Sequence, residues 1–369
     1  MHDEPKRINL LILASGDLWG GAEAIVYQLA KGLRNKPGVQ VHLVLFNYGR
    51  LYQLCTDAGI KTYVIDENRH GFIALAYKLI KTAKNIKPQI IHSHRYKENI
   101  LAAIVAPFVT FPRLVTTVHG ISEVKVSLYT KIVSAIERLL LRKCFSKVAA
   151  VSDDLRNYLI KHLGMPENLV TRIYNGIDSV QGMEKKKESH AFLTVGSAGR
   201  LVPVKGYTLL TEIARSICAK FPDIRFIIAG DGPEMEHLKA RVDEYGLGDR
   251  FRLPGQIEDV AEFYESLDIY INTSLHEGIP MTVLEAMNYS LPVIAPAVGG
   301  LMEIIENNKT GFLIEGRDPA SFAAAIEILI SSPDTAREMG DNACLRVHES
   351  FSMQRMVETY YSLYREILV

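Results

Sequence analysis

The amino-acid sequence predicts an α/β protein built from two doubly wound domains, each with a parallel sheet flanked by helices. Three observations lead to this prediction. The chain has 369 residues, which is long for one hydrophobic core and ordinary for two. Short apolar runs rich in β-branched residues alternate with amphipathic stretches. The alternation stops at the polar, charged residues 181–190 and then resumes. Two such domains, with their sheets facing a cleft, offer a place for a ligand.

The elements follow in order along the chain. Strands are expected in the first half at 8–15, 41–46, 60–65, 88–94, 114–120, 147–152 and 170–176. Strands are expected in the second half at 192–199, 223–230, 251–255, 268–274, 291–296 and 311–314. The chain is then expected to be helical, ending in an amphipathic helix that packs back on the first domain. The expected bounds are 1–180 and 191–350 for the domains, 181–190 for the linker and 351–369 for the last helix.

Composition restricts the class of protein. The four cysteines are widely spaced and form no CxxC pair, so neither a disulfide framework nor a zinc site is expected, and a reducing cytoplasm fits best. No apolar run approaches the roughly 20 residues that cross a bilayer. Residues 1–180 hold 24 Lys and Arg against 14 Asp and Glu, a balance of +10, whereas 181–369 hold 18 against 28, a balance of −10. The basic half favours an anionic partner, a phosphorylated acceptor or a membrane surface, with a solvated face as the simpler alternative.

Ligands of doubly wound sheets bind beyond the carboxyl ends of the strands, where we therefore look for chemistry. After the first strand, Gly20 and Gly21 open a helix whose free amides suit a phosphate or polar ligand. A tight turn explains these glycines equally well. After the expected strand 192–199, Arg200 and Lys205 precede Gly206. Together a planar guanidinium and a point charge can neutralise a diphosphate leaving group, which we prefer to solvated surface cations.

A glycine-containing loop carries Glu277, and the following helix carries Glu285. Amides of the loop, Gly278, Ile279, Pro280 and Met281, lie at the start of this helix, where all but the proline can donate to phosphate or sugar oxygens. A carboxylate such as Glu285 suits the vicinal hydroxyls of a ribose, although alone it would be an ordinary exposed helix residue.

Histidines end two strands of the first half. His119 follows one strand and can donate to a sugar hydroxyl or phosphate, or serve as a structural histidine. For His92 and His94 a structural role is expected, because HSH alone provides no metal set. Gly230 ends a strand of the second half, where a close ligand and ordinary turn chemistry are equal interpretations.

Taken together, these motifs resemble family 4 of the retaining GT-B glycosyltransferases. The motifs are GGAE, THG, NGID, GR with KG, GDGPE, EGIPMTVLEAM and PVIAPAVGGLMEII, in the family's order and over nearly the whole chain. Glu277 and Glu285 with seven residues between them form the most specific element, and the GG turn the least.

The resemblance implies a function for each motif. The first domain is the acceptor side and the second binds the nucleotide-sugar. Residues matching Arg200 and Lys205 bind the donor diphosphate, the match to Glu285 holds the ribose, and Glu277 with its loop addresses the transferred sugar. The match to His119 approaches the donor sugar, Gly20 and Gly21 lie close to donor phosphates and acceptor, and Glu303 lies beside the nucleotide. The reaction retains anomeric configuration without a metal or other cofactor; consistently, the sequence offers no convincing metal set.

Two departures from the family pattern concern the loop and helix just described. The loop after Glu277 reads GIPM where many relatives have GFGL, which leaves the identity of the sugar open. Asn288, Tyr289 and Ser290 follow LEAM where a small residue and glycine are commoner.

The expected function is transfer of a sugar from a nucleotide-diphosphate sugar to a saccharide or lipid-linked acceptor in cell-surface glycan or glycolipid synthesis. UDP is the expected nucleotide by family frequency, with GDP as the alternative, and no nucleic-acid partner is expected. A nucleotide-sugar epimerase or phosphorylase-like enzyme and a non-catalytic nucleotide-sugar-binding partner remain as rivals. A nicotinamide dehydrogenase is disfavoured because its glycine fingerprint is missing.

Residues 125–147 combine apolar positions at helical spacing with Lys and Arg. A basic amphipathic helix of this kind can rest on anionic lipid at the inner face of the cell membrane, and a core helix with a charged outer face is the commoner explanation.

Overall fold

The computed structural model describes residues 8–17, 19–120, 128–179 and 192–369. The chain divides into two compact units, the first formed by Met1–Asp178 and Met353–Val369 and the second by Ser179–Ser352. The linker expected at 181–190 lies outside the described residues. No helix in the described ranges is long and apolar enough to span a bilayer.

The first unit is built on a seven-stranded parallel sheet in the order β3-β2-β1-β4-β5-β6-β7. Its strands are β1 (Ile8–Ala14), β2 (Val39–Leu45), β3 (Lys61–Val64), β4 (Ile90–Ser93), β5 (Arg113–Val118), β6 (Lys147–Ala150) and β7 (Val170–Arg172). Its helices are α1 (Gly21–Arg34), α2 (Arg50–Asp57), α3 (Phe72–Ile86), α4 (Tyr96–Val105), the 3-10 turn η1 (Ala106–Phe108), α5 (Leu128–Cys144), α6 (Asp153–Lys161) and α14 (Met353–Ile367). The central strands are buried along nearly their whole length, as expected for a parallel sheet covered on both faces.

The C-terminal helix α14 returns to the first unit, as the sequence predicts, and packs on α1. Gly32 of α1 makes this close approach possible, because a Cβ there would lie 2.4 Å from Cγ2 of Val357. The apolar side of α14 is fully buried through Tyr360 and Tyr364. The helix within 125–147 is α5, which ends at Cys144, and the strand expected at 147–152 begins at Lys147 as β6.

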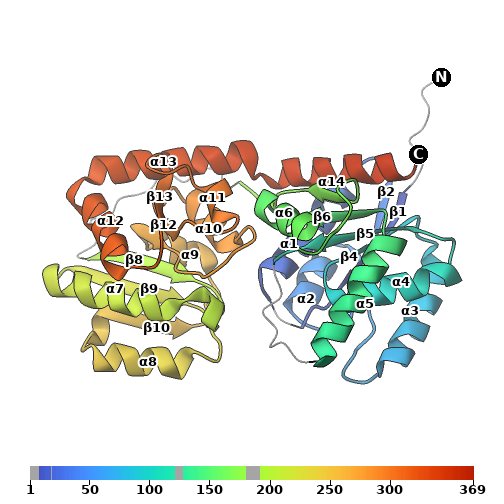
Figure 1. Cartoon of the computed structure of the whole chain (residues 1–369), viewed down its shortest axis with the longest axis horizontal. Helices are drawn as coiled ribbons and strands as arrows, with labels where there is room; N and C mark the ends of the chain where they lie inside the picture. Colours follow the sequence, from blue (N-terminus) through green and yellow to red (C-terminus); the bar gives the residue numbers. More distant parts are fainter. Residues whose placement is uncertain (1–7, 18, 121–127, 180–191) are drawn as a thin grey trace. The chain divides into compact units, whose positions relative to one another are not determined.

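The second unit contains a six-stranded parallel sheet in the order β10-β9-β8-β11-β12-β13. Its strands are β8 (Leu193–Ala198), β9 (Ile224–Ala229), β10 (Phe251–Gly255), β11 (Ile269–Ile271), β12 (Val293–Pro296) and β13 (Gly311–Ile314). Its helical elements are η2 (Pro203–Lys205), α7 (Tyr207–Lys220), α8 (Met235–Glu244), η3 (Gly248–Arg250), α9 (Val260–Glu265), α10 (Met281–Asn288), α11 (Leu301–Ile304), α12 (Pro319–Ser331) and α13 (Pro333–Ser350). The labels are shown in Figure 1.

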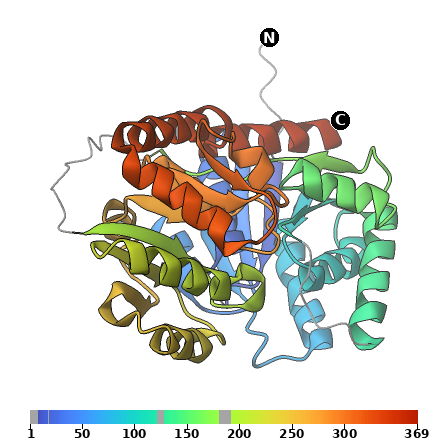
Figure 2. The same cartoon turned by 60° about the vertical axis from the view of Figure 1, so that its left-hand side comes forward.

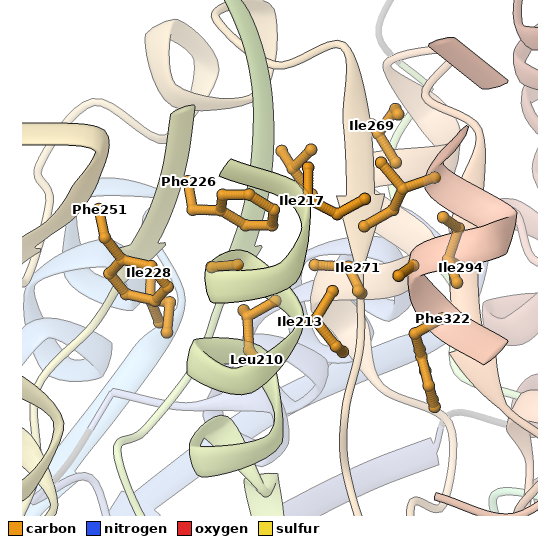
Figure 3. Close-up of a cluster of buried hydrophobic side chains, with 14 of the residues drawn as sticks. Leu210, Ile213, Ile217, Phe226, Ile228, Phe251, Ile269, Ile271, Ile294 and Phe322 are labelled. Atoms are coloured by element: carbon orange, nitrogen blue, oxygen red, sulfur yellow. The ribbon is translucent and has the colours of Figure 1, made fainter. Parts of the chain in front are cut away.

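The core of the second unit lies between the sheet and the neighbouring helices α7 and α12. Figure 3 shows Leu210, Ile213 and Ile217 of α7 directed at Phe226 and Ile228 of β9, with Phe322 of α12 nearby. These helical residues recur every three or four positions, so one face of α7 is apolar and must be covered. This core makes the sheet a rigid base for the loops at its carboxyl edge.

Candidate nucleotide-sugar site

The polar residues predicted in the second unit lie where the direction of the strand order changes. From β8 the chain continues outward on one side through β9 and β10, and then crosses to β11 on the other side. Ligands of doubly wound sheets bind at this kind of switch point, beyond the carboxyl ends of the strands. The segments that follow β8, β11 and β12 there carry Lys205, Glu277 and Glu303.

Lys205 and Glu277 form an ion pair at this edge. Lys205 Nζ lies 2.6 Å from Glu277 Oε1, and the two side chains are 21% and 10% exposed. The same oxygen accepts a hydrogen bond of 2.6 Å from Ser274 Oγ. The pair is largely shielded from solvent, and Glu277 Oε1 accepts two hydrogen bonds, so both side chains are held in one geometry. Such fixed geometry suits a site that binds a charged group of a ligand.

The loop that carries Lys205 is tied to the loop that carries Glu277. Gly206 follows in the left-handed region with φ 63°, and a Cβ there would lie 2.3 Å from Thr273 O. Thr273 Oγ1 donates to Lys205 O at 3.1 Å. Leu275 N donates to the carbonyl of Val204 at 2.7 Å. Glycine at 206 is therefore required both by its backbone conformation and by the close approach.

Arg200 has a different environment from Lys205. It lies directly after Gly199 at the end of β8 and is exposed. Within the described ranges its guanidinium makes no ion pair or hydrogen bond. Gly230 ends the neighbouring strand β9, and a Cβ there would lie 1.9 Å from Gly199 O. Gly230 therefore allows the two strand ends to meet and leaves Arg200 accessible.

Glu285 lies on the second turn of α10 and is held by a tyrosine that the sequence analysis did not single out. Tyr264 of α9 donates its hydroxyl to Glu285 Oε2 at 2.7 Å. Burial raises the pKa of the Glu285 carboxyl, and the hydrogen bond from Tyr264 opposes the rise. Tyr289 stacks on Tyr264 with ring centroids 5.4 Å apart, so a residue that departs from the family pattern packs on the tyrosine that holds Glu285.

Ser290, in the same departure from the family pattern, stands where glycine is commoner. Ser290 has φ 53°, in the left-handed region that glycine adopts at little cost. The commoner glycine fits this position better, and here a serine takes the same conformation.

The glycine pair at 299 and 300 brings the next loop against Glu277. Gly300 N donates to Glu277 O at 3.0 Å, and a Cβ on Gly300 would lie 1.7 Å from Gly278 O. Gly299 has φ 51°, and its Cβ would lie 2.2 Å from Glu277 O. The short helix α11, which carries Glu303, starts here, so backbone contact brings the start of this helix against Glu277 and Gly278, the first residue of the loop Gly278, Ile279, Pro280 and Met281.

The other predicted residues, Gly20, Gly21 and His119, belong to the first unit. Gly20 is the extended N-cap of α1, and its carbonyl accepts a hydrogen bond from Ala24 N at 3.0 Å. In the first turn of α1, the buried Glu23 pairs with Arg95, which follows β4. β1 and β4 flank the switch point of this sheet, so the glycine turn lies at the corresponding edge.

His119 follows β5 and contacts a second histidine. His94 Nδ1 lies 3.1 Å from His119 Nε2. Burial lowers the pKa of His119 to about 3, and the positive charge of Arg95 adds to the effect. His119 is therefore a neutral hydrogen-bonding group at physiological pH.

The fold is that of solved GT-B glycosyltransferases. Anabaena Alr3699/HepE in complex with UDP and glucose superposes with a TM-score of 0.86 at 23% identity, covering 98% of this chain and 100% of that one.

Family comparison agrees with the fold. The model of "Glycosyltransferase Family 4" matches residues 19–181, and that of "Glycosyl transferases group 1" matches 181–346. The chain therefore belongs to family 4 of the GT-B glycosyltransferases, and it is an enzyme of the hexosyltransferase type.

Two curated relatives span most of the chain. The Escherichia coli UDP-Gal:alpha-D-GlcNAc-diphosphoundecaprenol alpha-1,3-galactosyltransferase is 27% identical over 349 residues, 86% of this chain and 89% of the relative. The Bacillus anthracis N-acetyl-alpha-D-glucosaminyl L-malate synthase is 25% identical over 371 residues, 95% of this chain and 94% of the relative.

Proposed function

We propose that the protein transfers a hexose from a UDP-sugar to a lipid-linked or saccharide acceptor with retention of anomeric configuration. The observation that carries the proposal is the desolvated Lys205–Glu277 pair, tied to Ser274 at the switch point of the second sheet. The Escherichia coli relative supports a UDP-sugar donor and a diphosphate-linked lipid acceptor by its name. The complex of the Anabaena protein with UDP and glucose supports the same donor class.

The donor diphosphate is assigned to Arg200 and Lys205. As the bond between the anomeric carbon and the diphosphate oxygen breaks, its electron pair goes to that oxygen. Two cations placed before the reaction starts stabilise this developing charge without reorganisation. Glu277 orients Lys205 and addresses the sugar, while Glu285, held by Tyr264, accepts hydrogen bonds from the ribose hydroxyls.

The acceptor hydroxyl attacks the face of the sugar that the diphosphate leaves. A new bond forms from the acceptor oxygen to the anomeric carbon, and the hydroxyl proton goes to an oxygen of the departing diphosphate. No side chain of the protein is therefore needed to take the proton from the acceptor hydroxyl. We expect the reaction to proceed without a metal ion.

The test is acceptor-dependent release of UDP. The protein is incubated with UDP-galactose, UDP-glucose or UDP-N-acetylglucosamine, with and without a polyprenyl-diphosphate-linked N-acetylglucosamine. We expect one donor to release UDP with the acceptor, a product one sugar heavier by mass spectrometry, and an α-linkage by NMR. Isomerised donor without acceptor would favour the epimerase, binding without turnover would favour a non-catalytic partner, and a β-linkage would refute retention.

The exposed face of α5 supports peripheral contact with an anionic membrane. The side chains of Ile132, Ile136 and Leu139 are 51%, 46% and 57% exposed. A helix on the surface of a globular protein usually turns such apolar side chains toward the core. Their spacing places them on one face of α5, which lies beside α4 (Figures 1 and 2). Exposed cations lie on the same helix: Lys131, Arg138, Arg142 and Lys143. Lys125 lies outside the described residues. Apolar side chains within a basic surface suit anionic lipid.

Vesicle flotation tests this contact. We expect the protein to float with phosphatidylglycerol vesicles and not with phosphatidylcholine, and Ile136→Ser with Leu139→Ser to abolish flotation. The matched control is Ile328→Ser with Leu345→Ser, which replaces residues 49% and 58% exposed in the second unit. Equal failure to float with both lipids removes the membrane contact and leaves the transfer reaction untouched.

A further inference from the structure

His119 does not stand alone at the end of β5. Its ring stacks on that of His94, with centroids 5.3 Å apart and 23° between the planes. The hydrogen bond joins His94 Nδ1 to His119 Nε2. β4 and β5 pair in parallel through Ser93 and Thr116, so the residues that follow them leave the same edge of the sheet. One of the two nitrogens must donate the shared proton and the other must accept it.

Both rings are neutral, which limits the proton arrangements to two. Burial holds the pKa of His94 well below its usual value, as it does for His119. In the first arrangement His94 donates from Nδ1, and His119 carries its own proton on Nδ1. In the second, His119 donates from Nε2, and its Nδ1 is a bare acceptor. The two arrangements present opposite groups to a ligand.

The far nitrogen of His94 distinguishes the two arrangements. His94 Nε2 is buried and has no hydrogen-bond partner in the part of the chain that the structure describes. The second arrangement would leave an N–H there without an acceptor, whereas the first leaves only a lone pair. Buried N–H groups without a partner are rarer in proteins than under-satisfied acceptors. The first arrangement is therefore favoured.

We propose that His94 is a positioning residue that fixes His119 as its Nδ1–H tautomer, so that His119 presents a hydrogen-bond donor to an oxygen of the nucleotide-sugar. The proposal rests on the proposed function, which supplies the ligand. His119 Nδ1 makes no hydrogen bond within the described ranges, so its N–H is available. A neutral donor suits a sugar hydroxyl, because it binds an oxygen without competing for the proton that the acceptor loses.

The ring of His94 packs against a buried hydrogen-bonded group formed by His92, Thr117, Tyr360 and Tyr364. The His92 ring lies 4.3 Å from that of His94, centroid to centroid. His92 Nδ1 lies 2.7 Å from the Tyr364 hydroxyl, and its Nε2 lies 2.8 Å from Thr117 Oγ1. Thr117 Oγ1 in turn lies 2.6 Å from the Tyr360 hydroxyl. Both tyrosines belong to α14, so the C-terminal helix restrains the ring of His92, on which His94 packs.

The experiment compares His94→Asn with His94→Leu. The two replacements have similar shapes, but only the asparagine keeps a polar group that can bond His119 Nε2. In wild type, nitrogen NMR of ¹⁵N-histidine-labelled protein should show a protonated Nδ1 and a bare Nε2 for His119, assigned by loss of the signals in His119→Gln. We expect His94→Leu to mix the tautomers and to lower kcat/KM for the donor about tenfold. His94→Asn should restore most of the Nδ1–H tautomer and most of kcat/KM. Melting curves of both variants check the fold.

The outcomes separate this inference from the transfer reaction. A wild-type His119 protonated at Nε2 overturns the inference, and that spectrum needs neither substrate nor a variant of His94. Equal rates and equal tautomer signals in the two His94 variants also overturn it while the enzyme continues to transfer sugar. A protein that shows the Nδ1–H signal but transfers no sugar from any UDP-sugar refutes the proposed function and leaves the tautomer assignment standing.

Discussion

In the second unit the carboxyl edge of the sheet holds the Lys205–Glu277 ion pair, whereas in the first unit three neutral rings gather there beside the Arg95–Glu23 pair. Lys205 and Glu277 form an ion pair at the one edge. His92, His94 and His119 gather at the other, and burial lowers the pKa of each. The same doubly wound plan thus supports two kinds of recognition. Fixed charge suits a diphosphate, and neutral hydrogen-bonding groups suit a sugar.

The contrast also shows that net charge is a poor guide to the location of a site. The half of the chain that carries the cations assigned to the diphosphate has the balance of −10, and the basic half carries the neutral histidines. A few charges placed in a partly desolvated edge act more strongly than many solvated ones, because solvent and salt screen the latter.

The largest expected effect comes from removing the cation of the charged edge. We expect Lys205→Met to lower kcat by about 100- to 1000-fold, because a preorganised charge at the leaving group is lost. Lys239→Met is the matched control, since that exposed lysine pairs with Glu236 one helical turn away. Steady-state kinetics of both variants, with melting curves, measure the difference, and equal rates would remove Lys205 from the site.

The neutral rings predict a pH dependence of stability in the first unit, and the buried Glu98 opposes part of it because its pKa is raised to about 7. The pKa of His92 is lowered to about 3, whereas an unfolded histidine titrates near 6.5. The unfolded state therefore binds more protons between these values, so stability falls as the pH falls below about 6.5. At pH 5 the loss is about 2 kcal/mol each for His92 and His119, since the pKa of both is lowered to about 3.

Hydrogen exchange at several pH values, corrected for intrinsic rates, measures this loss for each unit. We expect amides of β4 and β5 to lose protection between pH 7 and pH 5, and amides of β8 and β11 to keep theirs. Equal losses of amide protection in both units would show that the histidines do not cause the pH dependence of stability.

A methyl group tests the close contact between two loops of the charged edge. We expect Gly300→Ala to cost about 1–3 kcal/mol and to weaken UDP binding, because its Cβ would overlap Gly278 O. Gly71→Ala is the control, since both glycines are N-caps with φ near −67°, and no atom lies within 4 Å of a Cβ at Gly71. Urea unfolding and calorimetry of both variants decide the matter; UDP binding unchanged in Gly300→Ala would contradict the loop assignment.

The smallest effect concerns the tyrosine that supports the ribose carboxylate. Tyr264→Phe removes one hydrogen bond to Glu285 and keeps the ring that stacks on Tyr289. We expect the donor KM to rise about fivefold, with kcat little changed, because a bond of about 1 kcal/mol that holds the ground state is lost. Tyr245→Phe, on the same unit, controls for removal of a hydroxyl.

Sequence predicted the parallel sheets and the return of the last helix, because apolar periodicity reflects which faces are buried. It also singled out Lys205 and Glu277, which stand in recognisable loops, and Glu285 on the helix that follows. It missed Tyr264, which lies 21 residues from Glu285 on a separate helix, and Tyr364, which lies 272 residues from His92. Such contacts form only when helices that are distant in the sequence pack together, so the spacing of residues along the chain does not predict them. For the same reason His94 was given a structural role without its link to His119.

The most direct test of the donor site is a thermal-shift panel of UDP-, GDP- and ADP-sugars on wild type and Glu285→Gln. A ligand that binds only the folded state raises its melting temperature with concentration. We predict stabilisation of wild type by UDP-sugars alone, and a much smaller shift in Glu285→Gln. No shift with any nucleotide-sugar at millimolar concentration, or equal shifts in both proteins, would contradict the assignment of the donor to the charged edge of the second unit.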